Sequence, residues 1–491
     1  MTTPTLEFNY DISCPFAYIA STRITSLASR ITANLHWRPV LLGAIYRATS
    51  APQGAAGSAS DVFNPTKKAV TARSMRRTLK RYNVPYNPPP QHPRKTVDAL
   101  RLLYFVDEEQ GQRERLTHAL FRAYWVEGRD VADRRVLLEV GRECGVEGAE
   151  GWTEEVFKDT AARARLEEET GKAIARGAFG VPGFWVPEVG WRDFQGERNV
   201  GRFYWGQDRM HFVEADLLAM RCGYAGEWRH VQGLKSLVPR CTTTNRLSWR
   251  VRVDFWYDFS SPWAFLGWTQ LPRLQRMFGE KLEIVLKPFL LGILFREIGA
   301  PNLPASAASA QKAIYSRQDH ADWVRFWNSV NEQEGRPDKA IEFHWADVFP
   351  IRTPTVLRCA IVEPACVPFL YRACWEKNSN VADDSVLTTV LNDAGFDGVD
   401  IVRRSAEQEI KEKLRSLTAE AKEVGICGVP SYRVFHEDKA GGWTDVSGVI
   451  WGQDELSVVE DVIAGWNSNE GDSPTAEPEK SGNMPLKESR L

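Results

Sequence analysis

Two short segments place a thiol or a hydroxyl where a helix should begin. Residues 11–18 read Asp-Ile-Ser-Cys-Pro-Phe-Ala-Tyr, and residues 258–265 read Asp-Phe-Ser-Ser-Pro-Trp-Ala-Phe. The proline after Cys14 and after Ser261 suits the first turn of a helix, where its missing N–H group is not needed. Free N–H groups and the helix dipole favour an anion at that point. We therefore expect a lowered pKa for the Cys14 thiol, which could act as a nucleophile, form a mixed disulfide or serve only as a weak S–H donor. At Ser261 we expect a hydrogen-bond donor.

The cysteine pattern limits the redox chemistry. Disulfide exchange through a Cys-x-x-Cys pair needs a second thiol three residues after the first. Ala17 and Ala264 occupy these positions, so a local dithiol is excluded. The eight cysteines of the chain form no Cys-x-x-Cys pair and no dense cluster, which argues against a zinc ribbon or a disulfide framework. We expect reduced thiols in a reducing compartment.

The chain repeats itself, because further motifs recur in the same order. Leu-Leu-Gly at 41–43 returns at 290–292, Gly-Val-Pro at 180–182 returns at 428–430, and Trp-Gly-Gln-Asp at 205–208 returns at 451–454. Including the Cys14 and Ser261 segments, each copy follows the first by 246–249 residues. Landmarks in one order at a nearly constant spacing indicate a tandem duplication.

The duplication sets the predicted domain boundaries. At about 100 to 200 residues per domain, a chain of 491 residues allows two to four domains, and the repeat narrows this to two. We expect one domain at 1–222, a linker at 223–249 that can dock on either half, a second domain at 250–467 and a disordered tail at 468–491. The tail ends in Ser489-Arg490-Leu491, a variant of the Ser-Lys-Leu address that the peroxisomal import receptor reads. The predicted localisation is therefore peroxisomal or cytoplasmic.

Composition and charge exclude several classes of protein. Hydrophobic residues make up 43% and charged residues 26% of the chain, which is typical of an ordinary globular protein. The formal net charge of −2 provides no field that would draw the chain to nucleic acid or to an anionic membrane. The longest strongly apolar stretch, 288–295, is far shorter than the roughly 20 residues of a membrane helix. No metal, nucleoside triphosphate or dinucleotide motif is present, so we expect a small-molecule or a protein partner.

The periodicity of each half predicts the elements that hold these motifs. An apolar run at 6–10 predicts a buried strand, which leads through a short loop into a helix at Pro15. A second strand at 35–41 and a long stretch with helical spacing follow. Short strands after the Gly-Val-Pro motif and a closing helix from Asp208 complete the half, and the second half repeats the pattern from 251 onward. This is the order of an α/β thioredoxin-type fold with a large helical insertion.

Together the motifs resemble the DsbA-like thioredoxin group that contains kappa-class glutathione transferases and 2-hydroxychromene-2-carboxylate isomerases. The resemblance rests on Asp-x-x-Cys/Ser-Pro-aromatic-Ala, on Pro-x-Leu-Leu-Gly at 39–43 and 288–292, on Gly-Val-Pro and on Trp-Gly-Gln-Asp. It implies two thioredoxin-like domains, glutathione as cofactor, and Cys14 and Ser261 as the catalytic residues. Because relatives in this group are commonly homodimers, it also implies that the halves pack as an intramolecular pseudo-dimer with approximate two-fold symmetry.

The resemblance also assigns residues to glutathione. The two Val-Pro pairs resemble a cis-proline corner, whose outward backbone groups pair with the tripeptide; a plain trans turn is the alternative. The aspartates of the Trp-Gly-Gln-Asp motif match positions that bind the γ-glutamyl end, assisted by the glutamines; capping of the closing helix is the alternative role. The residues assigned in this way are Val181, Pro182, Gln207, Asp208, Val429, Pro430, Gln453 and Asp454.

The helical insertion supplies candidate substrate residues in the second half only. Lys312 and Tyr315, followed by Asp319, match a pattern typical of the isomerases. In the first half the places that we align with them hold Lys68, Thr71 and Met75.

The resemblance implies a glutathione-dependent isomerase or transferase of secondary metabolism. In such an enzyme Ser261 would donate a hydrogen bond to the glutathione sulfur, and the thiolate would add to a conjugated enone of an aromatic or polyketide-like small molecule. Two alternatives stay open at this point. One is a single-thiol oxidoreductase acting through Cys14, and the other is a non-catalytic ligand-binding or scaffold protein.

Overall fold

The computed structural model describes residues 3–53, 59–108, 111–193, 196–224, 226–302 and 307–468. Of the predicted tail only residue 468 is included, so the Ser489-Arg490-Leu491 ending lies outside the described residues. Within the described ranges, no helix is both long enough and apolar enough to span a bilayer.

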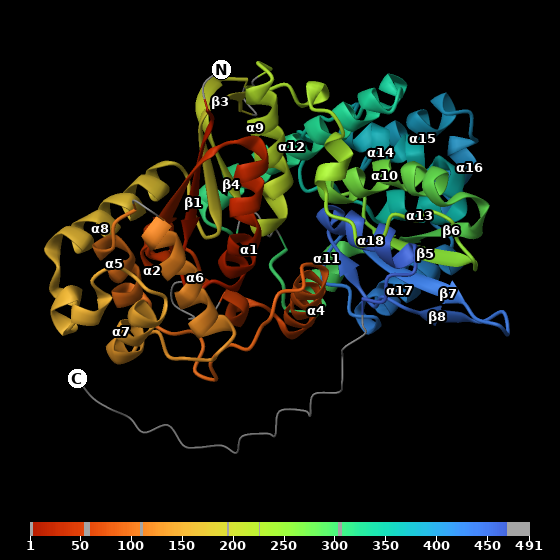
Figure 1. The fold of residues 1–491 in the computed structure, drawn as a ribbon. Coiled ribbons are helices and arrows are strands. Elements are labelled where there is room, and N and C mark those ends of the chain that lie inside the picture. The colour runs from red at the N-terminus through yellow and green to blue at the C-terminus, as the bar shows by residue number, and fades with distance from the viewer. Residues whose placement is uncertain are drawn as a thin grey trace, which may run out of the picture.

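Each half is built around one mixed sheet, and Figure 1 shows the two halves side by side. The first sheet has the order β2-β1-β3-β4, from β1 (Thr5–Tyr10), β2 (Asn34–Pro39), β3 (Gly183–Arg192) and β4 (Arg198–Trp205). The second has the order β6-β5-β7-β8 with β9 also beside β7, from β5 (Val251–Tyr257), β6 (Leu282–Pro288), β7 (Ser431–Glu437), β8 (Trp443–Asp445) and β9 (Ile450–Trp451). In both sheets the first two strands along the chain are parallel and the other pairs are antiparallel. The predicted α/β class with two repeated units is confirmed.

The helices of the first half follow the predicted order. A helix joins the two parallel strands, a helical insertion separates them from β3, and a closing helix follows β4. The helices are α1 (Pro15–Ile31), α2 (Leu42–Ala48), α4 (Pro65–Arg81), α5 (Val97–Phe105), α6 (Gln112–Trp125), α7 (Arg134–Glu143), α8 (Thr160–Ala175) and α9 (Met210–Arg221). Short 3-10 turns η1 (Ala59–Val62), η3 (Ala149–Gly151), η4 (Glu154–Lys158) and η5 (Gln207–Arg209) lie between them.

The second half repeats this plan with a longer first insertion helix. Its helices are α10 (Pro262–Phe278), α11 (Leu291–Glu297), α12 (Ala310–Gln333), α13 (Pro354–Val362), α14 (Val367–Trp375), α15 (Asp384–Asp393), α16 (Gly398–Ser405), α17 (Gln408–Glu423) and α18 (Leu456–Ile463). Its 3-10 turns are η8 (Gly279–Lys281), η9 (Pro337–Lys339), η10 (Pro364–Cys366) and η11 (Gln453–Glu455).

Matching tryptophans show how each insertion is fixed to the loop before the first helix. The indole N–H of Trp125, at the end of α6, donates to the carbonyl oxygen of Ile12 at 2.8 Å. Trp375, at the end of α14, makes the same bond to Phe259, also at 2.8 Å. Both indoles are fully buried, so each satisfies a loop carbonyl that water cannot reach. The insertion therefore positions the loops that carry Cys14 and Ser261.

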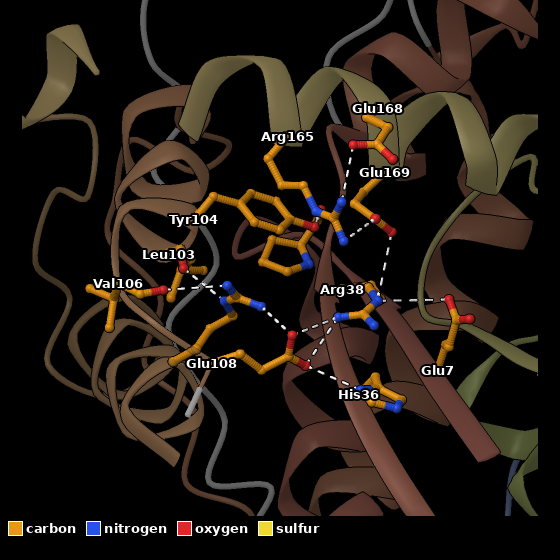
Figure 2. A network of polar contacts seen from close by, with 12 residues as sticks. Glu7, His36, Arg38, Leu103, Tyr104, Val106, Glu108, Arg165, Glu168 and Glu169 are labelled. Carbon is orange, nitrogen blue, oxygen red and sulfur yellow. Dashed lines mark hydrogen bonds and ion pairs between the residues drawn. The ribbon is translucent and has the colours of Figure 1, made fainter. Parts of the chain in front are cut away.

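A polar network fastens the insertion of the first half to the edge strand β2 (Figure 2). Arg38 donates to Glu108 at 3.0 Å and lies 3.6 Å from Glu169 of α8 and 3.8 Å from Glu7 of β1. Tyr104 of α5 donates its hydroxyl to a carbonyl oxygen of β2 at 2.8 Å. Because one guanidinium neutralises several carboxylates, α5 and α8 are held at this edge of the sheet.

The first insertion helix of each half contacts the opposite half. Ser74 of α4 donates to Glu455 at 2.7 Å, and Asp319 of α12 accepts from Arg209 at 2.8 and 2.9 Å. Figure 1 shows α4 among elements of the second half, and α12 beside β4 and α9 of the first. The approximate two-fold symmetry of the halves stays a prediction.

The segment predicted as a linker packs on both halves. Its 3-10 turns η6 (Trp228–His230) and η7 (Leu234–Leu237) follow α9. Trp228 stacks on Phe212 of α9 with ring centroids 5.0 Å apart. Arg240 donates to Asp461 of α18 at 2.7 Å, and the side chain of Gln333 of α12 donates to the linker backbone at 2.7 Å.

Candidate functional site

Cys14 lies at the predicted helix start, but its thiol is shielded from water. It occupies the N-cap position of α1, and its Sγ donates to the carbonyl oxygen of Val181 at 3.3 Å. Only 7% of the residue is exposed. Burial raises the pKa of Cys14 to about 12, although N–H groups of the first helical turn act in the opposite direction. Our expectation of a lowered pKa was wrong, because the cost of removing a thiolate from water exceeds the stabilisation by the helix end.

Ser261 has the same position at the start of α10 but a different hydrogen-bond pattern. Its Oγ accepts the backbone N–H of Ala264 at 3.2 Å, and the residue is 8% exposed. Among the described residues, no oxygen accepts the hydrogen of this hydroxyl. Since a hydroxyl can accept and donate at once, Ser261 caps its helix and can still donate to a bound atom.

Two buried aspartates fix the loops that carry Cys14 and Ser261. Asp11 accepts the N–H of Leu42 at 3.0 Å, and Asp258 accepts that of Leu291 at 3.0 Å. Each carboxylate thus joins its loop to the Leu-Leu-Gly segment that begins the next helix. Burial raises the pKa of Asp258, while backbone N–H groups oppose the rise. The signal for this role in the sequence is the recurrence of Asp11 as Asp258 at the first position of the repeated motif.

The Val-Pro pairs form the predicted corner next to these residues. The Val181–Pro182 and Val429–Pro430 peptide bonds are both cis, which confirms the prediction and rejects the trans alternative. The carbonyl oxygen of each proline accepts the N–H of the glycine in Trp-Gly-Gln-Asp, at 3.0 and 2.9 Å. These bonds bring the Trp-Gly-Gln-Asp motif of each half beside its own cis-proline.

The candidate substrate residues of the second half lie against the first half. The ammonium group of Lys312 is 5.3 Å from the ring centroid of Trp205. The backbone N–H of Trp205 donates to the hydroxyl of Tyr315 at 3.0 Å. Sequence alone could not show this, because both residues belong to α12 and only the tertiary arrangement carries them across.

The first half has a matching lysine, which is Lys67 and not Lys68. Asn64 and Ser309 both cap their helices by accepting the N–H of the residue three places on, at 2.9 and 3.3 Å. This common start aligns Lys67 with Lys312, and the ammonium group of Lys67 is 5.2 Å from the ring centroid of Trp451. The aligned residues in the first half are therefore Lys67, Val70 and Ser74, so our alignment of Lys68, Thr71 and Met75 was wrong by one residue. A search for repeated caps would have found the correct register.

The candidate glutathione aspartates meet at one arginine. Arg209 donates to Asp208 and, at 3.2 Å, to Asp454. The structure gives α9 and α18 no side-chain cap, so the alternative capping role of these aspartates is not observed. Burial raises the pKa of Asp454 to about 6; Arg209 opposes the rise and Asp208 adds to it.

The two motif glutamines differ in their contacts. Gln207 accepts from Arg23 through its side chain. The side-chain nitrogen and oxygen of Gln453 are buried and have no hydrogen-bond partner among the described residues. Gln453 lines a cavity of about 20 Å³, enough for a single water molecule.

A larger cavity of about 390 Å³ lies elsewhere in the first half, between α2, α5 and α8. Its lining includes Leu41, Arg47, Arg101 and Leu166 but none of the residues assigned to catalysis or glutathione. Within the described ranges, no group of three or more His, Cys, Asp and Glu residues could hold a metal ion.

Comparison with known proteins identifies the family. The sequence model of the DSBA-like thioredoxin domain matches residues 5–218 and, a second time, residues 252–464. The chain belongs to the DSBA-like thioredoxin domain family. The two matches agree with the tandem duplication inferred from the repeated motifs.

Curated relatives of this DSBA-like chain each align with part of it. 2-Hydroxychromene-2-carboxylate isomerase of Sphingobium xenophagum is 25% identical over 44% of this chain and 99% of the relative. Glutathione S-transferase kappa 1 of Rattus norvegicus is 24% identical over 36% of this chain and 78% of the relative. A solved structure of a 2-hydroxychromene-2-carboxylate isomerase covers 43% of this chain and 92% of its own, at 23% identity and a TM-score of 0.35.

Proposed function

We propose that the chain is a glutathione-dependent isomerase or transferase that acts on an aromatic or polyketide-like small molecule by thiolate addition to a conjugated system. The relatives named as an isomerase and as a kappa glutathione S-transferase support this class. The observation that carries the proposal is the hydroxyl of Ser261. It is buried at the start of α10, its oxygen is held by the helix, and its hydrogen is available to a ligand.

The second half is the site where glutathione becomes a thiolate. A hydrogen bond from Ser261 to the sulfur is worth roughly 1.5–3 kcal/mol, or about one to two pKa units in favour of the thiolate. The backbone of Val429 beside its cis bond would pair with the tripeptide. Lys67, which arrives from the first half, would supply a cation for a carboxylate of the ligand, and the positive charge also favours the thiolate.

In the isomerase reaction the sulfur forms a bond to the carbon at the far end of the enone. The electron pair of the double bond forms a new C=C bond to the carbonyl carbon while the carbonyl π pair moves to oxygen as an enolate, and the former double bond, now single, rotates. The C–S bond then breaks, the double bond returns in the other geometry, and the glutathione thiolate is restored. In the transferase reaction the adduct takes a proton from water and leaves with its C–S bond intact. The enzyme contributes orientation and a stabilised thiolate to both reactions.

In the first half, Cys14 has a different role from that of Ser261 in the second. Because burial raises the pKa of Cys14 to about 12, the group is a neutral thiol near pH 7, which disfavours the single-thiol oxidoreductase. We propose that Cys14 acts as a weak S–H donor to a glutathione sulfur, in competition with its bond to Val181.

Calorimetry and turnover of the full-length chain test the proposal. Glutathione is titrated into the natural chain and into the Ser261→Ala, Cys14→Ala and Ser416→Ala variants; Ser416 is an exposed residue of α17 and serves as the matched control. We expect a loss of affinity of at least about tenfold for Ser261→Ala and none for Ser416→Ala. A panel of conjugated enones is then assayed with and without glutathione for both isomer and conjugate. Unchanged binding in Ser261→Ala, together with no turnover of any enone, would overturn the enzyme proposal and leave the scaffold alternative.

A further inference from the structure

The two crossing helices occupy equivalent positions but differ in charge at two aligned positions that contact the opposite half. Their matching caps align Ser74 of α4 with Asp319 of α12, and Arg77 with Asp322. Position 77 of α4 thus carries a base where position 322 of α12 carries an acid, and Ser74 of α4 is neutral where Asp319 of α12 is acidic.

The surfaces that contact these helices also differ in charge: the first half carries arginines where the second half carries a glutamate and a glycine. The repeated Trp-Gly-Gln-Asp motif aligns Arg209 with Glu455, and counting back the same distance aligns Arg202 with Gly448. The first half thus presents two arginines to α12. The second half presents a glutamate and a glycine to α4.

The contacts of α12 use these charges directly. Nε and Nη2 of Arg209 lie 2.8 and 2.9 Å from the two carboxylate oxygens of Asp319. Arg202 donates to Asp322. All four residues are buried, so both pairs are largely shielded from solvent screening.

The contacts of α4 involve the residues at the equivalent positions, Ser74 and Arg77 on the helix and Glu455 and the Gly448 segment on the second half. Ser74 donates to Glu455 at 2.7 Å. Arg77, which is 2% exposed, donates to the backbone carbonyl oxygens of Ser447 and Val449, the second at 3.2 Å. These carbonyl oxygens flank Gly448, where a Cβ atom would lie 2.6 Å from the guanidinium of Arg73, so a side chain at this position would crowd α4.

Pairing of two identical halves would bring like charges together. Two first halves would place Arg77 against Arg202, and two second halves would place Asp319 against Glu455. A buried charge without an opposite partner is strongly unfavourable. Charges at interfaces act in this way to reject incorrect partners as well as to hold correct ones.

We propose that this charge inversion makes each half select the other half of the same chain and reject a copy of itself. The linker supports a partner within one chain, because Trp228 packs on the first half and Arg240 binds the second. A short connection held at both ends also gives the two halves a high effective concentration. One consequence is that each candidate site receives its lysine from the other half.

The test uses the full-length chain and charge-reversing variants. Arg209→Glu should separate α12 from the first half, which increases the radius of gyration in solution scattering and the rate of proteolysis in the linker. Arg198→Glu is the matched control, because Arg198 is an exposed arginine of β4 in the same half. The exchange Arg209→Glu with Asp319→Arg returns the same set of charges around Asp208 and Asp454, and should restore compactness at least in part. Sedimentation of the natural chain should give the mass of one chain at every concentration.

Three results would overturn the proposal. Arg209→Glu could remain as compact and as resistant to protease as Arg198→Glu. The exchanged variant could be no more compact than Arg209→Glu, which would show that residue identity and not charge complementarity matters. The natural chain could sediment as a dimer that Arg209→Glu converts to single chains, which would assign a second copy to these surfaces.

Discussion

The protonation state of Cys14 gives the sharpest test of the first candidate site. A catalytic thiolate at a helix start would react with alkylating reagents near neutral pH. Here the thiol is buried and bonded to the carbonyl oxygen of Val181, so its reactivity should appear only in strongly alkaline solution. The perturbation is a rise in pH, applied to the natural chain.

The magnitude follows from the shift. Burial raises the pKa of Cys14 from an ordinary 9.0 to about 12, so ionisation costs about 4 kcal/mol more than in water. At pH 8 a thiol of pKa 9 is about one-tenth thiolate, whereas Cys14 would be about one part in ten thousand. We expect alkylation to be about three orders of magnitude slower than that of an ordinary thiol, before any effect of restricted access.

The assay is labelling with iodoacetamide between pH 7 and 10, followed by mass spectrometry of the peptide that contains Cys14. Exposed Cys222 is labelled in the same sample and provides the reference, and circular dichroism checks that the fold persists at each pH. The labelling rate of Cys14 should rise about tenfold per pH unit without reaching a plateau. A plateau below pH 9, or a rate at pH 8 close to that of Cys222, would refute the conclusion that burial controls this thiol.

Two further predictions concern the second site. Lys67→Met should weaken glutathione binding by about tenfold, because it removes the cation beside Trp451; Lys68→Met is the matched control, and equal effects of the two changes in calorimetry would contradict the assignment. Asp454 has a pKa raised to about 6 in the folded chain, so its ionisation reduces the free energy of unfolding as pH rises from about 4 to 6. The free energy of unfolding of Asp454→Asn, measured by urea titration, should therefore rise relative to that of the natural chain across this pH range, by at most about 3 kcal/mol. A difference between the two chains that does not grow with pH would show that the carboxyl ionises normally.

The sequence was sufficient for the features that depend on local pattern. Repeated motifs revealed the duplication, and apolar runs beside prolines predicted the strand-helix-strand start of each half. The cis bonds before Pro182 and before Pro430 were expected from the family resemblance, and the structure confirms both. Each motif and each strand or helix start is encoded within a few adjacent residues, so these predictions needed no knowledge of the tertiary arrangement.

Features that depend on packing could not be predicted in this way. Lys312 was assigned to the second half because it belongs there in sequence, but α12 carries it to Trp205 of the first. The direction of the Cys14 shift was wrong for a related reason. A helix start can be recognised from one proline, whereas desolvation is set by every element that surrounds the thiol.

The difference between Cys14 and Ser261 is therefore more than an exchange of sulfur for oxygen. The Cys14 thiol donates its only hydrogen to Val181. Because burial raises the pKa of Cys14 to about 12, the thiolate that a cysteine nucleophile needs is scarce near neutral pH. The serine hydroxyl accepts from its helix and keeps its hydrogen for a ligand. Each candidate site has a lysine of the other half beside its tryptophan, Lys312 at Trp205 and Lys67 at Trp451. Under the proposed function, the first half supplies Lys67 to the second site, so selection on that site would retain the first half even where Cys14 does no chemistry.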